Sequence, residues 1–233
     1  GAGSGAEADA LATAARGDST FAYFAVTGTD DFNNEEVRAL AERLDAAHVP
    51  NRLAVFDGTH EWPPASVCGQ ALAWLELRAM RAGLAPTDSA LIARRLDAEL
   101  AYADTLEGGG RWDEASRLFS AIARDYPRSP RTDDAARHAA AIESRELMRR
   151  LRARMRELAV RSAQRGVDVQ SALLWFRGQK DVPSAASLAD RLQLSTLRRE
   201  TSAGDSLEAS AARRMLNRIS TLVSFYEPRA YLA

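Results

Sequence analysis

The chain has 233 residues, with 31 Lys and Arg against 32 Asp and Glu, and therefore a formal net charge of -1. This balance provides no field that would attract a polyanion, so nucleic acid is not an expected partner. Hydrophobic residues make up 46% and charged residues 27%, the proportions of a globular protein with a core. No stretch approaches the roughly 18 consecutive apolar residues of a membrane span, so no membrane-spanning helix is predicted.

The N-terminal part predicts a strand, a helix and a second strand. Residues 21–26 form a short run rich in aromatic and apolar side chains that ends at Thr27-Gly28, which is typical of a buried strand. Residues 51–56 form a similar run that closes at Asp57-Gly58. Between them, residues 35–48 predict an amphipathic helix, whose apolar stripe at i, i+3, i+4 and i+7 consists of Val37, Leu40, Ala41 and Leu44. A connection of this length suits a parallel crossover, so the two strands are expected to be parallel neighbours.

A change in composition follows the next helix. This helix is predicted after Pro63-Pro64, and its expected buried face is formed by Val67, Ala71, Trp74 and Leu75. Beyond residue 83 no strand-like run occurs and every segment has helical spacing, which divides the chain into residues 1–84 and an all-α region, residues 85–233. Helices are predicted over residues 88–107, 111–127, 133–162, 168–179 and 184–201, and a last one carries Met215, Ile219, Leu222 and Val223.

The ends of the two predicted strands carry the residues best suited to chemistry. Asp31 follows the first strand and His60 follows the second. Loops at the carboxyl ends of parallel strands meet at one edge of the sheet, where ligands bind in α/β folds. Hydrolysis through an acyl intermediate needs an imidazole that takes a proton from a nucleophile and a carboxylate that orients the imidazole. Asp31 and His60 are therefore the candidate catalytic residues, expected within about 2.6–3.2 Å of each other.

The turns that carry these residues, Gly28-Thr-Asp-Asp31 and Gly58-Thr-His60, resemble those of α/β-hydrolases of the carboxylesterase, phospholipase or dienelactone-hydrolase kind. The resemblance spans residues 21–84, about a quarter of the chain. It implies that residues 1–84 are the C-terminal portion of a hydrolase domain with the last two parallel strands of its sheet. It also implies that Asp31 and His60 are the acid and the base of a Ser-His-Asp triad, and that the substrate is an acyl ester.

The sequence departs from this family at the nucleophile. A Gly-x-Ser-x-Gly elbow occurs nowhere in the chain, because Ser4 lacks the glycine two places after it and no predicted strand precedes it. In the family the elbow precedes the acid, so we expect residue 1 to be an internal position of a longer protein. The Gly17-Asp-Ser19 stretch resembles the nucleophile block of another serine-hydrolase class, but it lies only about 40 residues before His60 and no predicted strand precedes it.

Other interpretations of these residues remain open. His60 can be a loop histidine held by Pro63-Pro64 near Trp62, and either Asp30 or Asp31 can cap the helix that begins near Asn33. Three further residues are expected to have no catalytic role because they fall on helical segments: His48, His138 and Cys68.

Residues 103–127 resemble a tetratricopeptide repeat. The positions that carry the resemblance are small residues at the helix contact, a turn glycine, aromatic residues of the second helix and a terminal proline: Ala103, Gly110, Trp112, Ala115, Phe119 and Pro127. The window that starts at Pro130 lacks the turn glycine and the aromatic residue, and an ordinary pair of antiparallel helices is the alternative.

Taken together, the sequence predicts an α/β fragment followed by a mainly α-helical, repeat-like region. The leading functional hypothesis is the C-terminal portion of a bacterial serine hydrolase that supplies Asp31 and His60, and the alternative is a helical scaffold that binds a protein or peptide. The chain contains no phosphate loop, dinucleotide fingerprint or His-rich metal motif, so no cofactor is expected.

Overall fold

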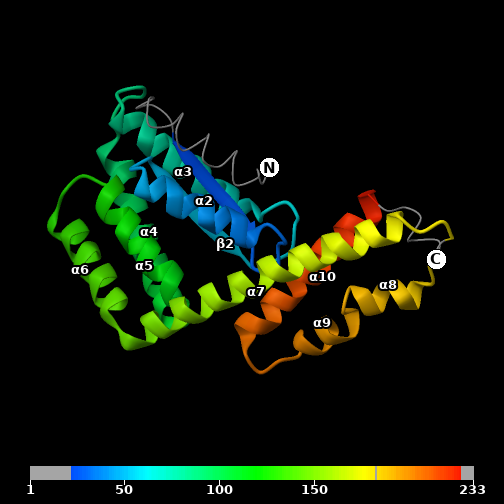
Figure 1. Cartoon of the computed structure of the whole chain (residues 1–233). Helices are drawn as coiled ribbons and strands as arrows, with labels where there is room; N and C mark the ends of the chain where they lie inside the picture. The colour runs from blue at the N-terminus through cyan, green and yellow to red at the C-terminus, as the bar shows by residue number, and fades with distance from the viewer. Residues whose placement is uncertain (1–21, 182, 227–233) are drawn as a thin grey trace.

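The computed structural model describes residues 22–181 and 183–226 and begins with a small α/β unit (Figure 1). Its elements are β1 (Tyr23–Gly28), α2 (Asn34–Ala46), β2 (Asn51–Phe56) and α3 (Ala65–Arg81). The strands are parallel neighbours, paired from Tyr23 with Asn51 to Gly28 with Phe56, which confirms the predicted crossover. Phe21, expected at the start of the first strand, lies outside the described residues.

The remaining described elements are all helical, so the protein is mostly α-helical with a small parallel sheet. They are α4 (Ser89–Gly108), α5 (Trp112–Asp125), α6 (Pro130–Ser144), α7 (Glu146–Arg177), α8 (Ala185–Arg191), α9 (Leu194–Glu200) and α10 (Ser206–Tyr226). Across residues 22–181 and 183–226, no strand follows Phe56, as the sequence predicts for the region after Thr87.

Several predicted helix bounds are wrong. The helix expected over residues 133–162 is two helices, because Arg145 has an extended backbone (φ -65°, ψ 135°) and serves as C-cap of α6 and N-cap of α7. The expected break before residue 168 is absent, and α7 continues through a buried Gly166. The helix expected over residues 184–201 is divided at Gln193, which takes a left-handed conformation with φ of 53°.

The predicted faces of α2 and α3 contain buried residues, but one residue assigned to them is exposed. On α2, Ala41 and Leu44 are 1% and 0% exposed, and Val67 and Trp74 of α3 are also buried. Leu75 is 42% exposed, so its placement on the buried face of α3 is wrong. The inward face of α3 instead continues from Trp74 to Leu77 and Met80, which maintains the helical spacing of three.

Two apolar clusters organise the helical region, and α7, the long helix in Figure 1, belongs to both. Met148 near its start packs with α4, α5 and α6, whereas Phe176 near its end packs with α8, α9 and α10. Leu77 of α3 joins the first cluster, so the apolar core crosses the division predicted at residues 84 and 85. The N-terminal unit and the first helices after it therefore share one core.

The outer edge of β2 is covered by arginine side chains from α5 and the residue before it. Arg111 donates to the Val55 carbonyl oxygen at 3.1 Å, and Arg124 donates to the Asn51 carbonyl oxygen at 2.6 Å. These bonds satisfy backbone acceptors that an edge strand otherwise leaves to solvent or to another strand. The α5 helix thus ends the sheet on the β2 side.

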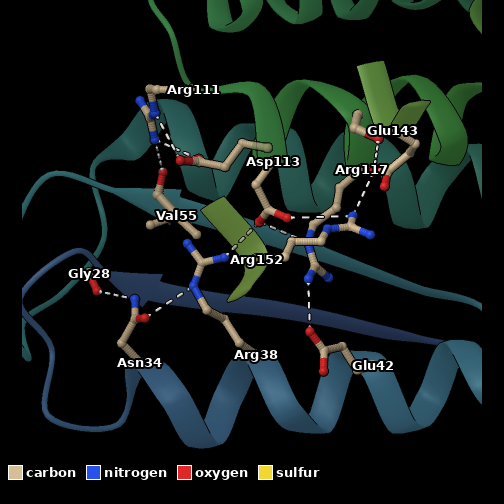
Figure 2. Close-up of polar contacts among 12 residues, drawn as sticks. Gly28, Asn34, Arg38, Glu42, Val55, Arg111, Asp113, Arg117, Glu143 and Arg152 are labelled. Atoms are coloured by element: carbon tan, nitrogen blue, oxygen red, sulfur yellow. Dashed lines mark hydrogen bonds and ion pairs between the residues drawn. The ribbon is translucent and has the colours of Figure 1, made fainter. Parts of the chain in front are cut away.

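A polar seam next to this edge joins α2 to α5 and α7 (Figure 2). Asp113 of α5 is buried and accepts hydrogen bonds from Arg38 of α2 at 3.1 Å and from Arg117 at 3.2 Å. Arg117 also binds Glu42 of α2 at 3.0 Å, and Arg152 of α7 binds Glu143 of α6 at 2.6 Å. The helical region is therefore tied to the α/β unit by charged contacts as well as by the shared core.

Candidate functional site

Asp31 lies in the loop that connects β1 to α2. The residue is 7% exposed, and its Oδ1 accepts a hydrogen bond from the Asn33 backbone N–H at 2.8 Å. The Asn33 side chain, which lies at the N-cap position of α2, makes no capping hydrogen bond. Asp31 therefore orders the start of α2 while its second oxygen stays available for another partner.

His60 meets this carboxylate from the loop that follows β2. Its Nδ1 lies 3.2 Å from Asp31 Oδ1 and 3.3 Å from Oδ2, at the limit of the expected separation. The ring also rests on Phe32, with centroids 4.6 Å apart. Trp62, considered as its neighbour from the sequence, is 94% exposed. The structure thus brings together the two residues that the sequence singled out.

The open side of the imidazole is its Nε2 atom. The His60 side chain is 58% exposed, and Nε2 makes no hydrogen bond to a residue of the described ranges. With Nδ1 facing a carboxylate, a neutral ring holds its proton on Nδ1 and presents an unprotonated Nε2 to solvent. This is the arrangement that a general base requires when its orienting acid is in place.

The backbone of the two loops holds the pair together. The Asp30 N–H donates to the Gly58 carbonyl oxygen at 2.9 Å, and the Thr29 N–H donates to the Phe56 carbonyl oxygen at 2.8 Å. A Cβ on Gly28 would lie against the Gly58 carbonyl oxygen and 2.5 Å from that of Thr59, so only glycine permits this approach. The spacing between Asp31 and His60 follows from these contacts.

A second group of residues at this site was not predicted from the sequence. Asp30 is bound by side chains of α10, about 180 positions later in the chain: Ser210, Arg213 and Asn217. The only local signal is a polar face of α10 opposite its apolar stripe. Such a face is ordinarily solvated, and nothing in the sequence indicates the loop as its target.

The other residues considered from the sequence lie elsewhere. His138 on α6 binds Glu107 of α4 at 2.6 Å and stacks on Phe119, with ring centroids 4.6 Å apart. His48 follows α2 with φ of 57°, and Cys68 is exposed on α3. Ser4 and Ser19, the serines weighed as nucleophiles, lie outside the described residues.

The Asp31 and His60 pair does not line the cavity of about 950 Å³ that lies against β2. Residues of α2 to α7 line this cavity, among them Arg52, Trp74 and Arg95, but neither Asp31 nor His60 does. No group of three or more His, Cys, Asp or Glu side chains within the described ranges could hold a metal ion. None of the helices described is long and apolar enough to cross a membrane.

Comparisons with protein-family models, curated proteins and solved structures found no match to this chain.

Proposed function

We propose that Asp31 and His60 are the acid and the base of a serine-hydrolase site that acts on acyl esters. The observation that carries this proposal is the 3.2 Å separation of His60 Nδ1 from Asp31 Oδ1 at the carboxyl ends of adjacent parallel strands. The resemblance of both turns to those of carboxylesterase-type α/β-hydrolases supports the same assignment. Asp31 would orient the ring and stabilise its cation, and His60 would take the proton of a serine hydroxyl.

The nucleophile and the oxyanion donors must come from sequence beyond the described residues. The open edge of β1 supports this part of the proposal. In the observed register, Phe24 and Val26 direct their backbone N–H and C=O groups away from β2, and no described residue bonds to them. A parallel strand paired with this edge would end beside Asp31, so a serine loop following it would be delivered to the pair.

Ester hydrolysis tests the proposal in two forms of the protein. We expect that the 233-residue chain does not raise the hydrolysis rate of p-nitrophenyl acetate above the uncatalysed background. A protein extended upstream through a Gly-x-Ser-x-Gly elbow should hydrolyse this ester. His60→Ala in the extended protein should lower kcat by on the order of 10³-fold or more.

His138→Ala is the matched control, because His138 also contacts a carboxylate and an aromatic ring. It should leave kcat unchanged. Equal losses of kcat in the two variants would contradict the proposal that Asp31 and His60 act with a serine from outside the described residues. Turnover by the 233-residue chain that His60→Ala abolishes would contradict it as well.

An exposed apolar row on α7 favours the second candidate function, a helical scaffold. Val160, Val167 and Leu174 are 72%, 55% and 63% exposed and recur every seven residues, the spacing with which one helix packs on another. The ligand would be one amphipathic helix of a partner protein. A photo-crosslinker at residue 167 should then give a discrete adduct that Val160→Glu abolishes, while His60→Ala leaves it unchanged.

A further inference from the structure

The C-terminal helix α10 reaches the loop that carries the proposed acid. Asp30 Oδ2 accepts from Arg213 Nε at 2.6 Å, and Oδ1 accepts from Ser210 Oγ at 2.8 Å. Asn217 Nδ2 donates to the Asp30 carbonyl oxygen at 2.9 Å. One residue of the β1–α2 loop is therefore held through three of its oxygen atoms by a single helix.

Neighbouring contacts extend this attachment along the loop and into α2. Arg214 donates to the Thr29 carbonyl oxygen at 3.0 Å and to Glu35 Oε1 at 3.2 Å. Arg218 forms an ion pair with Glu36 at 3.6 Å. The contacting residues recur at i, i+3, i+4 and i+7 on α10, so they form one face of the helix: Ser210, Arg213, Arg214 and Asn217.

The opposite face of α10 belongs to the C-terminal core. Ala212, Met215 and Ile219 are buried in the cluster formed with α7, α8 and α9. The helix is thus fixed on its apolar side and contacts the loop on its polar side. Because its apolar side is packed, α10 can act as a rigid support for the loop.

From these contacts we infer that Asp30, held by Arg213 and Ser210 of α10, is a positioning residue that sets the Asp31 carboxylate against His60. This inference rests on the proposed function for its catalytic meaning. Asp30 is adjacent to Asp31 and donates its own N–H to the Gly58 carbonyl oxygen at 2.9 Å, so it connects α10 to both loops of the pair. Loss of the α10 contacts would release the Asp31 carboxylate from Nδ1.

The tautomer of His60 reports this positioning directly. When Nδ1 donates to Asp31, the neutral ring is in the Nδ1–H form, and without that acceptor it reverts to the Nε2–H form that a free side chain prefers. Long-range ¹H–¹⁵N NMR of the 233-residue chain distinguishes the two forms at a pH where the ring is neutral. We expect the Nδ1–H form in the unaltered chain and the Nε2–H form after Arg213→Met or Asp30→Asn.

Control variants separate positioning from simple docking of the helix. Arg161→Met removes ion pairs of α7 with Glu208 of α10 (2.7 Å) and with Glu157 (2.9 Å) but does not touch the loop, so His60 should keep its Nδ1–H form. If Arg213→Met prevents folding, Ser210→Ala provides a milder change. Arg213→Lys should restore part of the Nδ1–H population.

An unchanged His60 tautomer in folded Arg213→Met and Asp30→Asn would overturn the inference, as would an equal change in Arg161→Met. Because the readout is independent of catalysis, it separates this inference from the proposed function. A tautomer change without ester hydrolysis by the extended protein would contradict the proposed function alone.

Discussion

Asp31 and Asp125 each meet a basic side chain from a distant segment, yet their surroundings differ. Asp125 is 0% exposed and its oxygens accept from Arg52 at 2.7 Å, Trp74 at 2.8 Å and Arg124 at 3.1 Å. Asp31 faces His60, whose side chain is 58% exposed. The sealed carboxylate accepts three hydrogen bonds and holds α5 to β2 and α3, whereas the open pair leaves His60 Nε2 without a hydrogen bond to any described residue. Accessibility of the partner, more than the contact itself, distinguishes a candidate site from a structural ion pair.

Removing the sealed carboxylate should have the largest effect on stability. Asp125→Ala leaves Arg52, which is 8% exposed, without its closest partner and deprives Trp74 Nε1 of its acceptor. We expect the free energy of unfolding to fall by about 3–5 kcal/mol, as measured by urea denaturation. A loss below about 1 kcal/mol would show that this network does not hold the α/β unit to α5.

Disturbing the close approach of the loops that follow β1 and β2 should have the next largest effect on the free energy of unfolding. Gly28→Ala places a methyl group against backbone oxygens of Gly58 and Thr59, which cannot turn away, and should cost about 1–3 kcal/mol or more. Gly166→Ala is the matched control, since an added Cβ there meets no atom within 4 Å and favours helix α7 by up to about 1 kcal/mol. Equal unfolding free energies for the two variants would contradict the tight contact between the loops.

Acid should remove the stabilising contribution of the sealed carboxylate, Asp125. Burial by itself raises the pKa of Asp125, but the charges of Arg52 and Arg124 and the hydrogen bonds from Arg52 and Trp74 hold it below its ordinary value. Its stabilising contribution is therefore present above about pH 4 and is lost as the pH falls through the lower folded-state pKa. Urea titrations between about pH 5 and pH 2 should show a smaller loss of stability for Asp125→Asn than for the unaltered chain.

The open pair should contribute least to stability. His60 is mostly exposed, so His60→Ala should change the free energy of unfolding by less than about 0.5 kcal/mol. Circular dichroism with urea denaturation measures this change. A large destabilisation would indicate that His60 is retained to hold its loop, which is the structural interpretation of the residue.

The local patterns of the sequence predicted the parallel strands and the Asp31 and His60 pair, because strand ends and a short crossover determine where those side chains lie. They did not predict the division at Arg145, where no glycine or proline marks the break between α6 and α7. Local sequence patterns also did not predict the contact of Asp30 with Arg213. Hydrophobic periodicity identifies the buried face of a helix, but it does not identify which distant loop a polar face will bind.

Labelling by a fluorophosphonate tests the assignment of Asp31 and His60 most directly. An activated serine attacks the phosphorus atom and expels fluoride, so one phosphonyl group becomes attached to each competent site. We predict stoichiometric labelling of a serine upstream of Gly1 in the extended protein, loss of that labelling in His60→Ala, and retention in His138→Ala. Labelling that persists in His60→Ala, or that occurs on the 233-residue chain alone, would contradict the assignment.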